Sequence, residues 1–193
     1  GAHDLSKILK FQDAKFLAIC DVRNERRETI KSTVDKAYGN SDCKMYSDQY
    51  ELLARPDVDA VLIATGDRWH TPLSIIAAQH GKDVYCEKPC SMSIEESWAL
   101  GDAFKRYNRL YQAGCQRRNG ANFKLCRELL QAGALGKLTA LYANVGPSVN
   151  WPPLPSRDWL EGQELPPKQV LDWDRWLGPA PWRPYHPSYV SGG

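Results

Sequence analysis

Glu87, Lys88 and Pro89 place a carboxylate, an ammonium and a rigid ring directly after the short apolar run 83–86. In an open α/β sheet, ligands bind beside the carboxyl ends of the strands, so a strand over 83–87 would deliver both charges to a site. Pro89 restricts the backbone of Lys88 to extended conformations. A fixed ammonium can stabilise negative charge that develops on an oxygen. Because a solvated turn can have the same composition, the surrounding elements must decide between the two interpretations.

A second chemical signal is Asp21, which ends the apolar run 16–20. It follows Gly1 by about 20 positions, the separation typical of a dinucleotide-binding glycine turn and the carboxylate that binds the adenosine ribose. If Gly1 is the last glycine of such a turn, the earlier glycines and the first strand are missing. Asp21 also fits a turn or a helix cap. Arg23 could contact a ribose 2′-phosphate, which weakens the preference for NAD over NADP without reversing it.

The elements that position these residues alternate along the chain. Continuous apolar runs predict buried strands at 16–20, 60–65, 83–87 and 110–115, with a short strand at 44–46. Amphipathic spacing predicts helices at 5–11, 25–38, 50–53, 73–80 and 93–107. Expected helix signals are Ser47 and Thr71 as N-caps, a capping box from Ser93 to Glu96, and glycine stops at Gly39 and Gly81. The pattern predicts an α/β protein, a Rossmann-like doubly wound parallel sheet whose first strand is missing.

After residue 118 the pattern changes. We expect residues 1–118 to form an N-terminally truncated NAD(P)-binding Rossmann domain, and 119–193 to begin an incomplete C-terminal α/β domain for substrate binding and oligomerisation. A helix with Phe123 and Leu130 and a strand over 137–145 are predicted, then a helical turn over 171–177. Most of the 13 prolines and 7 tryptophans lie after residue 145. Trp173 and Trp176 could form a sugar-stacking wall, but their helical spacing favours core packing.

Composition excludes several classes of protein. With 25 basic and 23 acidic residues, the chain lacks the charge expected of a nucleic-acid or anionic-membrane partner. No apolar run approaches the length of a membrane span. The 6 cysteines form no Cys-x-x-Cys pair, which favours buried thiols and a reducing compartment. The 4 histidines are scattered, so no metal site is expected.

With these residues placed, the sequence resembles the glucose-fructose oxidoreductase, inositol dehydrogenase and MocA-like (Gfo/Idh/MocA) family along essentially its whole length. The most specific segment is 81–89, which looks like the family's strand with its Glu-Lys-Pro signature. The segments 20–22, 65–70 and 171–181 also look like family segments. One departure is Gly66, where the family usually has proline after threonine. The family's catalytic Asp and His motif lies beyond this chain, and His186 does not replace it.

The resemblance implies site residues. Lys88 would be the catalytic residue that touches the substrate hydroxyl, and it would also border the cofactor. Partial burial could also lower the pKa of the Lys88 amine towards the range useful for proton transfer. Residues expected to bind the cofactor, NAD with NADP as the alternative, are Gly1, Asp21, Thr65, His70, Glu87 and Lys88. One of Gln116, Arg117 and Arg118 could also approach the ligand, although ordinary surface positions explain them equally well.

The implied function is an NAD(P)-dependent dehydrogenase that transfers hydride between nicotinamide and a secondary alcohol of a sugar, cyclitol or glycoside. Two alternatives stay open: an NAD-dependent glycosidase with no net redox change, and a non-catalytic cofactor-binding regulatory protein. The partner would be a small polyol or sugar, with no nucleic acid and no membrane, and the full-length protein would form homo-oligomers. We expect a cytoplasmic location, with periplasmic export possible if a signal precedes the fragment. The fragment itself would be inactive.

Overall fold

The computed structural model describes residues 1–142 and 160–190. The chain divides into two compact units: Gly1–Gly114 with Gln163–Gly193, and Cys115–Gly162. The change at residue 115 is close to the predicted end of the Rossmann domain. The segment from 163 onward, however, groups with the first unit, whereas the sequence predicts one second domain over 119–193. The existence of that second domain stays a prediction.

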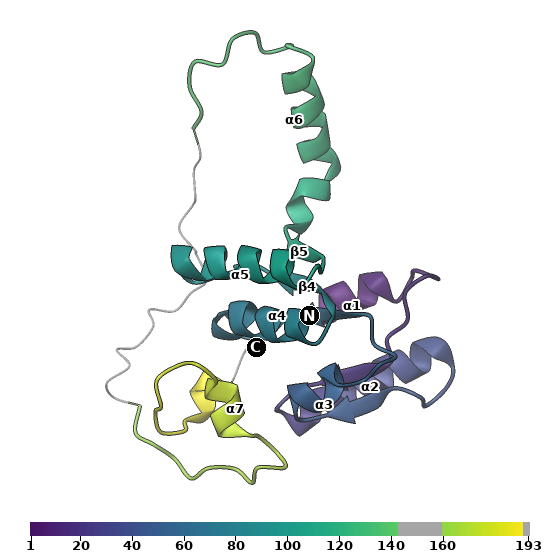
Figure 1. Cartoon of the computed structure of the whole chain (residues 1–193), viewed down its shortest axis with the longest axis vertical. Coiled ribbons are helices and arrows are strands. Elements are labelled where there is room, and N and C mark those ends of the chain that lie inside the picture. Colours follow the sequence, from purple (N-terminus) through teal and green to yellow (C-terminus); the bar gives the residue numbers. More distant parts are fainter. Residues whose placement is uncertain (143–159, 191–193) are drawn as a thin grey trace. The chain divides into compact units, whose positions relative to one another are not determined.

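The first unit alternates strands and helices, as the apolar runs predict (Figure 1). Its strands are β1 (Ala18–Cys20), β2 (Lys44–Tyr46), β3 (Ala60–Ile63), β4 (Asp83–Glu87) and β5 (Tyr111–Gly114). Its helices are α1 (Ala2–Ile8), α2 (Asn24–Tyr38), α3 (Gln49–Leu53), the 3₁₀ turn η1 (Asp67–Trp69), α4 (His70–Gln79), α5 (Ile94–Arg106), α7 (Trp173–Leu177) and the 3₁₀ turn η4 (Pro187–Tyr189).

All observed strand pairs are parallel, and they form two sheets in the order β1-β2 and β3-β4-β5. The register aligns Ala18 with Lys44, Ala60 with Asp83, and Glu87 with Gly114. Each connection within a sheet passes through a helix, which gives three βαβ units. The predicted fold class, a Rossmann-like arrangement of parallel strands and helices, is confirmed.

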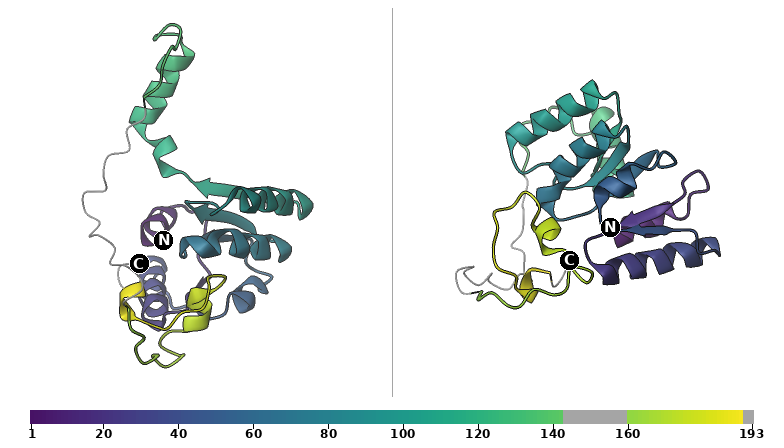
Figure 2. Two further views of the ribbon diagram at one scale, coloured as in Figure 1. Left: turned by 90° about the vertical axis from the view of Figure 1, so that its left-hand side faces the viewer. Right: turned by 60° about the horizontal axis from the view of Figure 1, so that its bottom comes forward.

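Two apolar cores lie between the sheets and their helices. Val84 and Cys86 project from the same face of β4 and pack with Ala77 of α4 and Phe104 of α5. Alternate residues of a strand share a face, so Glu87 belongs to the opposite set. The second core joins Leu5 of α1 to α2 and the segment before β2. Figures 1 and 2 show α4 and α5 side by side against one sheet and α2 against the other.

Two helix signals predicted from the sequence, the glycine stop at Gly39 and the N-cap at Ser93, are confirmed. Gly39 ends α2 with a φ of 67°, the left-handed conformation that glycine adopts without a steric cost. Ser93 caps α5 by accepting a hydrogen bond from the backbone N–H of Glu96. The reciprocal half of the predicted capping box is different, because the Glu96 carboxylate accepts from the N–H of Met92 instead.

Two cap predictions were wrong. Asp48, not Ser47, caps α3, and its side chain accepts from the N–H of Tyr50 at 2.8 Å. Thr71 lies inside α4 rather than before it, because η1 leads directly into the helix at His70. The Thr71 hydroxyl therefore contacts another segment, which matters for the site below.

The tract over 163–190, which contains α7 and is called the α7 tract below, packs on the rest of the first unit. The backbone of Leu171 forms an antiparallel bridge with Arg23, and Asp172 N donates to Val22 O at 3.2 Å. Trp173 is buried and stacks on Trp176 with ring centroids 4.7 Å apart. The prediction of core packing for these two tryptophans is therefore confirmed.

The second unit contains the 3₁₀ turn η2 (Gln116–Asn119) and α6 (Ala121–Gln131). The strand predicted over 137–145 is wrong for 137–142, which form no ladder, and its last residues lie outside the described ranges. A strand requires a partner with free backbone groups, and none pairs with this described segment. Cys115 and Cys126 are exposed in this unit, contrary to the expectation of buried thiols, whereas Cys43 and Cys86 are buried.

Two features are absent from residues 1–142 and 160–190. No helix there has the length and apolar character needed to cross a bilayer. No three His, Cys, Asp or Glu side chains there are grouped as a metal ion would need.

Candidate functional site

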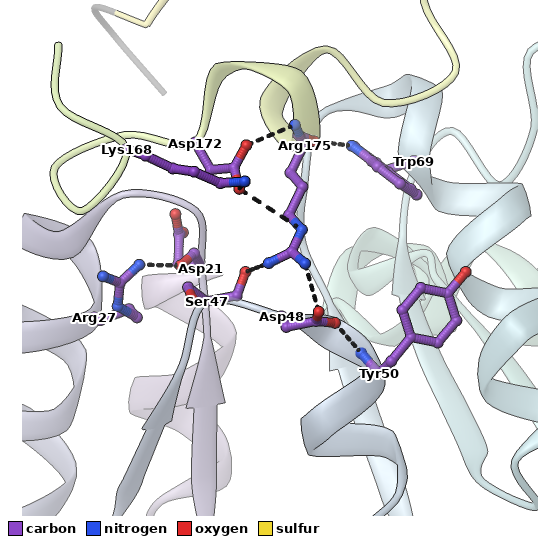
Figure 3. A network of polar contacts seen from close by, with 9 residues as sticks. All are labelled: Asp21, Arg27, Ser47, Asp48, Tyr50, Trp69, Lys168, Asp172 and Arg175. Atoms are coloured by element: carbon purple, nitrogen blue, oxygen red, sulfur yellow. Dashed lines mark hydrogen bonds and ion pairs between the residues drawn. The ribbon is translucent and has the colours of Figure 1, made fainter.

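The segments that follow β1, β2 and β3 all contact the α7 tract, which places the carboxyl ends of these strands on one rim. Val22 follows β1 and accepts from the N–H of Asp172. Ser47 follows β2, and its carbonyl accepts from the Arg175 guanidinium at 3.2 Å. Trp69, after β3, donates from Nε1 to Arg175 O at 2.9 Å. Figure 3 shows the contacts of Ser47 and Trp69 converging on Arg175, with Asp21 at the same rim.

The end of β4 joins this rim through His70. The His70 side chain is 1% exposed, with Nε2 3.2 Å from Thr65 O and Nδ1 2.6 Å from Pro89 O. Thr65 follows β3 and Pro89 follows β4, so one ring spans the two strand exits. Asp21 and Lys88 therefore lie at the carboxyl ends of their strands, on the side where ligands of doubly wound sheets bind.

Asp21 is a half-buried carboxylate at the end of β1. Its Oδ1 accepts a hydrogen bond from Arg23 N at 2.8 Å, and its carbonyl accepts from the Arg27 guanidinium at 2.5 Å. Burial raises the pKa of Asp21, while the Arg23 N–H and the nearby arginine charges oppose that rise. A partly desolvated carboxylate gains from hydroxyl donors, which is the chemistry of a ribose diol.

Arg23 is directed away from a role as a phosphate ligand. Its guanidinium donates to Val190 O at 2.8 Å and lies 3.4 Å from the Glu25 carboxylate. These contacts engage the Arg23 guanidinium with the α7 tract and with α2. The observation favours NAD over NADP, in agreement with the preference that Asp21 indicates.

Glu87 is held close to β5 because its neighbour is glycine. A Cβ added at Gly114 would lie 3.0 Å from both Glu87 Cα and Glu87 Oε1, and 3.1 Å from Cys86 O. The Glu87 carboxylate also accepts from the N–H of Lys88 at 3.2 Å. Sequence reasoning missed Gly114. The signal that could have found it is a glycine at a strand end, which often marks a close backbone approach.

Lys88 is exposed, so the described chain does not show the partial burial that could prepare its amine for proton transfer. The reason is geometric: Lys88 is the first residue beyond β4, where no further strand residue covers it. Exposure leaves its amine within reach of a ligand. Thr65 is also exposed, at the end of β3.

Gly1 precedes α1 and lies against the end of β3. A Cβ at Gly1 would be 3.2 Å from Ala64 Cβ, so the start of α1 approaches the strand exit closely. The close approach of Gly1 suits the phosphates of a dinucleotide, and the half-buried Asp21 carboxylate suits its ribose. Gly1 and Asp21 therefore fit NAD, and the contacts of Gly1, Asp21, Thr65, Glu87 and Lys88 with it stay predictions. His70 is different, because its ring contacts backbone carbonyls inside the protein.

The chain is similar to known oxidoreductases. The profile of GFO_IDH_MocA, described as "Oxidoreductase family, NAD-binding Rossmann fold", matches residues 1–115. A myo-inositol 2-dehydrogenase of Thermotoga maritima is 34% identical over 137 residues, which are 71% of this chain and 39% of that protein. A scyllo-inositol 2-dehydrogenase (NAD(+)) of Bacillus subtilis is 36% identical over 94 residues, 49% of this chain and 28% of that protein.

Solved structures show the same relationship. A probable dehydrogenase from Thermotoga maritima superposes with a TM-score of 0.60 at 31% sequence identity. The match covers 69% of this chain and 39% of the other. The chain thus spans about two fifths or less of the length of the relatives named here.

Proposed function

The chain belongs to the GFO_IDH_MocA family of oxidoreductases with an NAD-binding Rossmann fold, and on this premise we propose that it serves an NAD-dependent dehydrogenase. The proposed substrate is a secondary alcohol of a sugar, cyclitol or glycoside. The names of the two inositol dehydrogenases support this substrate class. NAD is preferred to NADP because Asp21 ends β1 and the Arg23 guanidinium is engaged elsewhere.

The observation that carries the proposal is the position of Lys88. It is an exposed amine at the carboxyl end of β4, and its backbone N–H donates to the Glu87 carboxylate. The His70 ring contacts both Pro89 and Thr65, which links the end of β4 to the rim where Asp21 follows β1. A turn at an arbitrary surface position would not combine these features. The interpretation of Glu87 and Lys88 as a plain solvated turn is therefore disfavoured.

Within this proposal each residue has a defined part. Asp21 would accept hydrogen bonds from the adenosine ribose, and Glu87 would fix the nicotinamide side. NAD, when bound, supplies the hydride acceptor. The hydroxyl proton would pass to a general base of the full-length protein, while the Lys88 ammonium donates a hydrogen bond to the substrate oxygen and stabilises the negative charge that develops there. One preorganised donor of this kind contributes about 10²–10³ in rate.

The test is Lys88→Met in the full-length protein, with NADH formation followed on a panel of inositols and sugars. We expect kcat to fall about 10²–10³-fold, with the affinity for NAD nearly unchanged. Lys105→Met is the matched control, because Lys105 is an exposed lysine on α5 away from the rim. Turnover that survives Lys88→Met at the rate of the control would contradict the proposal.

Two further parts of the proposal concern the whole protein. We infer that the full-length protein forms homo-oligomers and is cytoplasmic. The family resemblance supports the first part, and 6 free cysteines, which suit a reducing compartment, support the second. Mass photometry of the full-length protein tests the first part, and a monomer at cellular concentration would contradict it.

A further inference from the structure

Two consecutive buried residues at the start of α4 hold the segment that follows Lys88. His70 and Thr71 are 1% and 3% exposed, and both direct polar side-chain atoms to the backbone beyond Lys88. Neither contact lies within α4 itself. A buried polar side chain needs a partner, so these contacts matter energetically for both segments.

His70 contacts Pro89. Nδ1 lies 2.6 Å from Pro89 O, and because a carbonyl only accepts, Nδ1 carries the proton of this hydrogen bond. The other ring nitrogen faces Thr65 O at 3.2 Å. The ring therefore lies between the loop after β3 and the loop after β4 and contacts both.

Thr71 contacts Cys90, the residue that follows Pro89. Its hydroxyl lies 3.0 Å from Cys90 O and 3.2 Å from Glu96 Oε2. The same carboxylate oxygen accepts from the N–H of Met92 at 2.7 Å. The backbone is thus held at Pro89, Cys90 and Met92, immediately beyond Lys88.

We propose that His70 and Thr71 are positioning residues that fix the backbone beyond Lys88 and so aim its exposed amine. The inference rests on the proposed function of Lys88. It assigns His70 a role that acts through Pro89 and Thr65, in place of direct contact with the cofactor. A lysine side chain is long and flexible, so the place where its backbone is anchored limits where the amine reaches.

The test uses His70→Phe and Thr71→Val in the full-length protein. Both substitutions keep approximate size and burial but remove the polar contacts. A displacement near 1 Å can cost about 10²-fold in rate, so we expect kcat to fall about 10- to 100-fold while the Kd for NAD changes less than about threefold. His80→Phe is the control, because His80 is exposed and its Nδ1 contacts only its own helix, at Ile76 O, in the described structure.

A double-mutant cycle with Lys88→Met identifies the route of the effect. If His70 acts through Lys88, His70→Phe costs little further rate once Lys88 has been replaced. Full additivity of the two losses overturns the proposal. Thr71→Val keeps the test valid if His70→Phe fails to fold, because it removes the Cys90 contact independently.

Hydrogen exchange supplies a readout that does not depend on activity. We expect amides in 88–92 to exchange faster in both variants, with unchanged exchange in α2. Unchanged exchange in 88–92 overturns the proposal, even if activity falls. The two proposals fail differently: an active Lys88→Met variant refutes the function of Lys88, whereas an inactive Lys88→Met with fully active His70→Phe refutes only the positioning.

Discussion

At the scale of single residues, burial disfavours the charged form of the Asp21 carboxylate, whereas hydrogen bonds from ribose hydroxyls would favour it. Its position after an apolar run predicts a strand end, and the structure confirms that position. Burial raises its pKa, so the folded form retains a proton to higher pH than the unfolded chain does. Its stabilising contribution is present below the ordinary carboxylate pKa and is lost as pH rises through the raised value. Ribose hydroxyls would offset this cost.

We therefore predict that Asp21→Asn separates stability from binding. The amide oxygen can still accept from Arg23 N, so unfolding at pH 7 should occur at an equal or higher denaturant concentration than in the wild type. The affinity of the full-length protein for NAD should fall about 10- to 100-fold, the loss of a hydrogen bond to a charged group. Denaturant unfolding and calorimetric titration measure the two effects. Asp42→Asn, an exposed control, should change neither, and undiminished NAD affinity in Asp21→Asn would contradict the assignment.

Gly114 gives a steric prediction. The added Cβ of Gly114→Ala would press on Glu87 and Cys86, so we expect a loss of about 1–3 kcal/mol in the free energy of unfolding. Gly101→Ala is the opposite case, because the new Cβ has open space inside α5, and it should stabilise by about 0.5–1 kcal/mol. Urea titrations compare them, and equal effects at both positions would show that the contact with Glu87 is unimportant.

At the scale of elements, the sequence predicted each strand of the sheets but not every cap. Continuous apolar runs that are short and bounded by turn signals are typical of strands covered on both faces. Ser47 and Asp48 are both good caps, however, and only the backbone geometry decides between adjacent candidates. Thr71 was misassigned for a related reason, since η1 moves the start of α4 to His70. The consequence for the site is that Thr71 holds Cys90 instead of capping a helix.

The cap assignment can be measured directly. Asp48→Ala removes the acceptor of Tyr50 N and the ion pair with Arg175, so it should lower the free energy of unfolding by about 1–2 kcal/mol. Ser47→Ala should change it by less than about 0.5 kcal/mol. Chemical denaturation of the two variants distinguishes them, and a larger loss at Ser47 would restore the sequence-based assignment.

At the scale of the first compact unit, the α7 tract closes over the ends of β1, β2 and β3. Arg68 stacks on Trp176 at 4.1 Å and donates to the carbonyls of Trp176 and Leu177. Composition predicted a change of character after residue 145 but not this packing. The contact of Arg175 with Asp48 joins residues 127 positions apart, and no local pattern encodes such a distance. The family resemblance identified the segment 171–181 without placing it.

Arg175 should control how firmly this tract is held. Arg175→Met removes the guanidinium contacts with Asp48 and Ser47 while it preserves the aliphatic stem. We expect faster hydrogen exchange at the amides of Asn24 and Asp172, which bond across to the other segment. Exchange in β4 should be unchanged. Equal protection of Asn24 and Asp172 in the variant and the wild type would show that the tract is held without Arg175.

The central claim is that an amine at the end of β4 assists the removal of hydride from an alcohol by an NAD-dependent protein. The most direct measurement uses full-length protein, NAD and an inositol deuterated at its carbinol carbons, with mass spectrometry of the recovered cofactor. We predict that the cofactor gains one deuterium with the wild type and that Lys88→Met slows this gain about 10²–10³-fold. Absence of label in the cofactor while the substrate is consumed, or equal labelling by the Lys88→Met variant, would contradict the account.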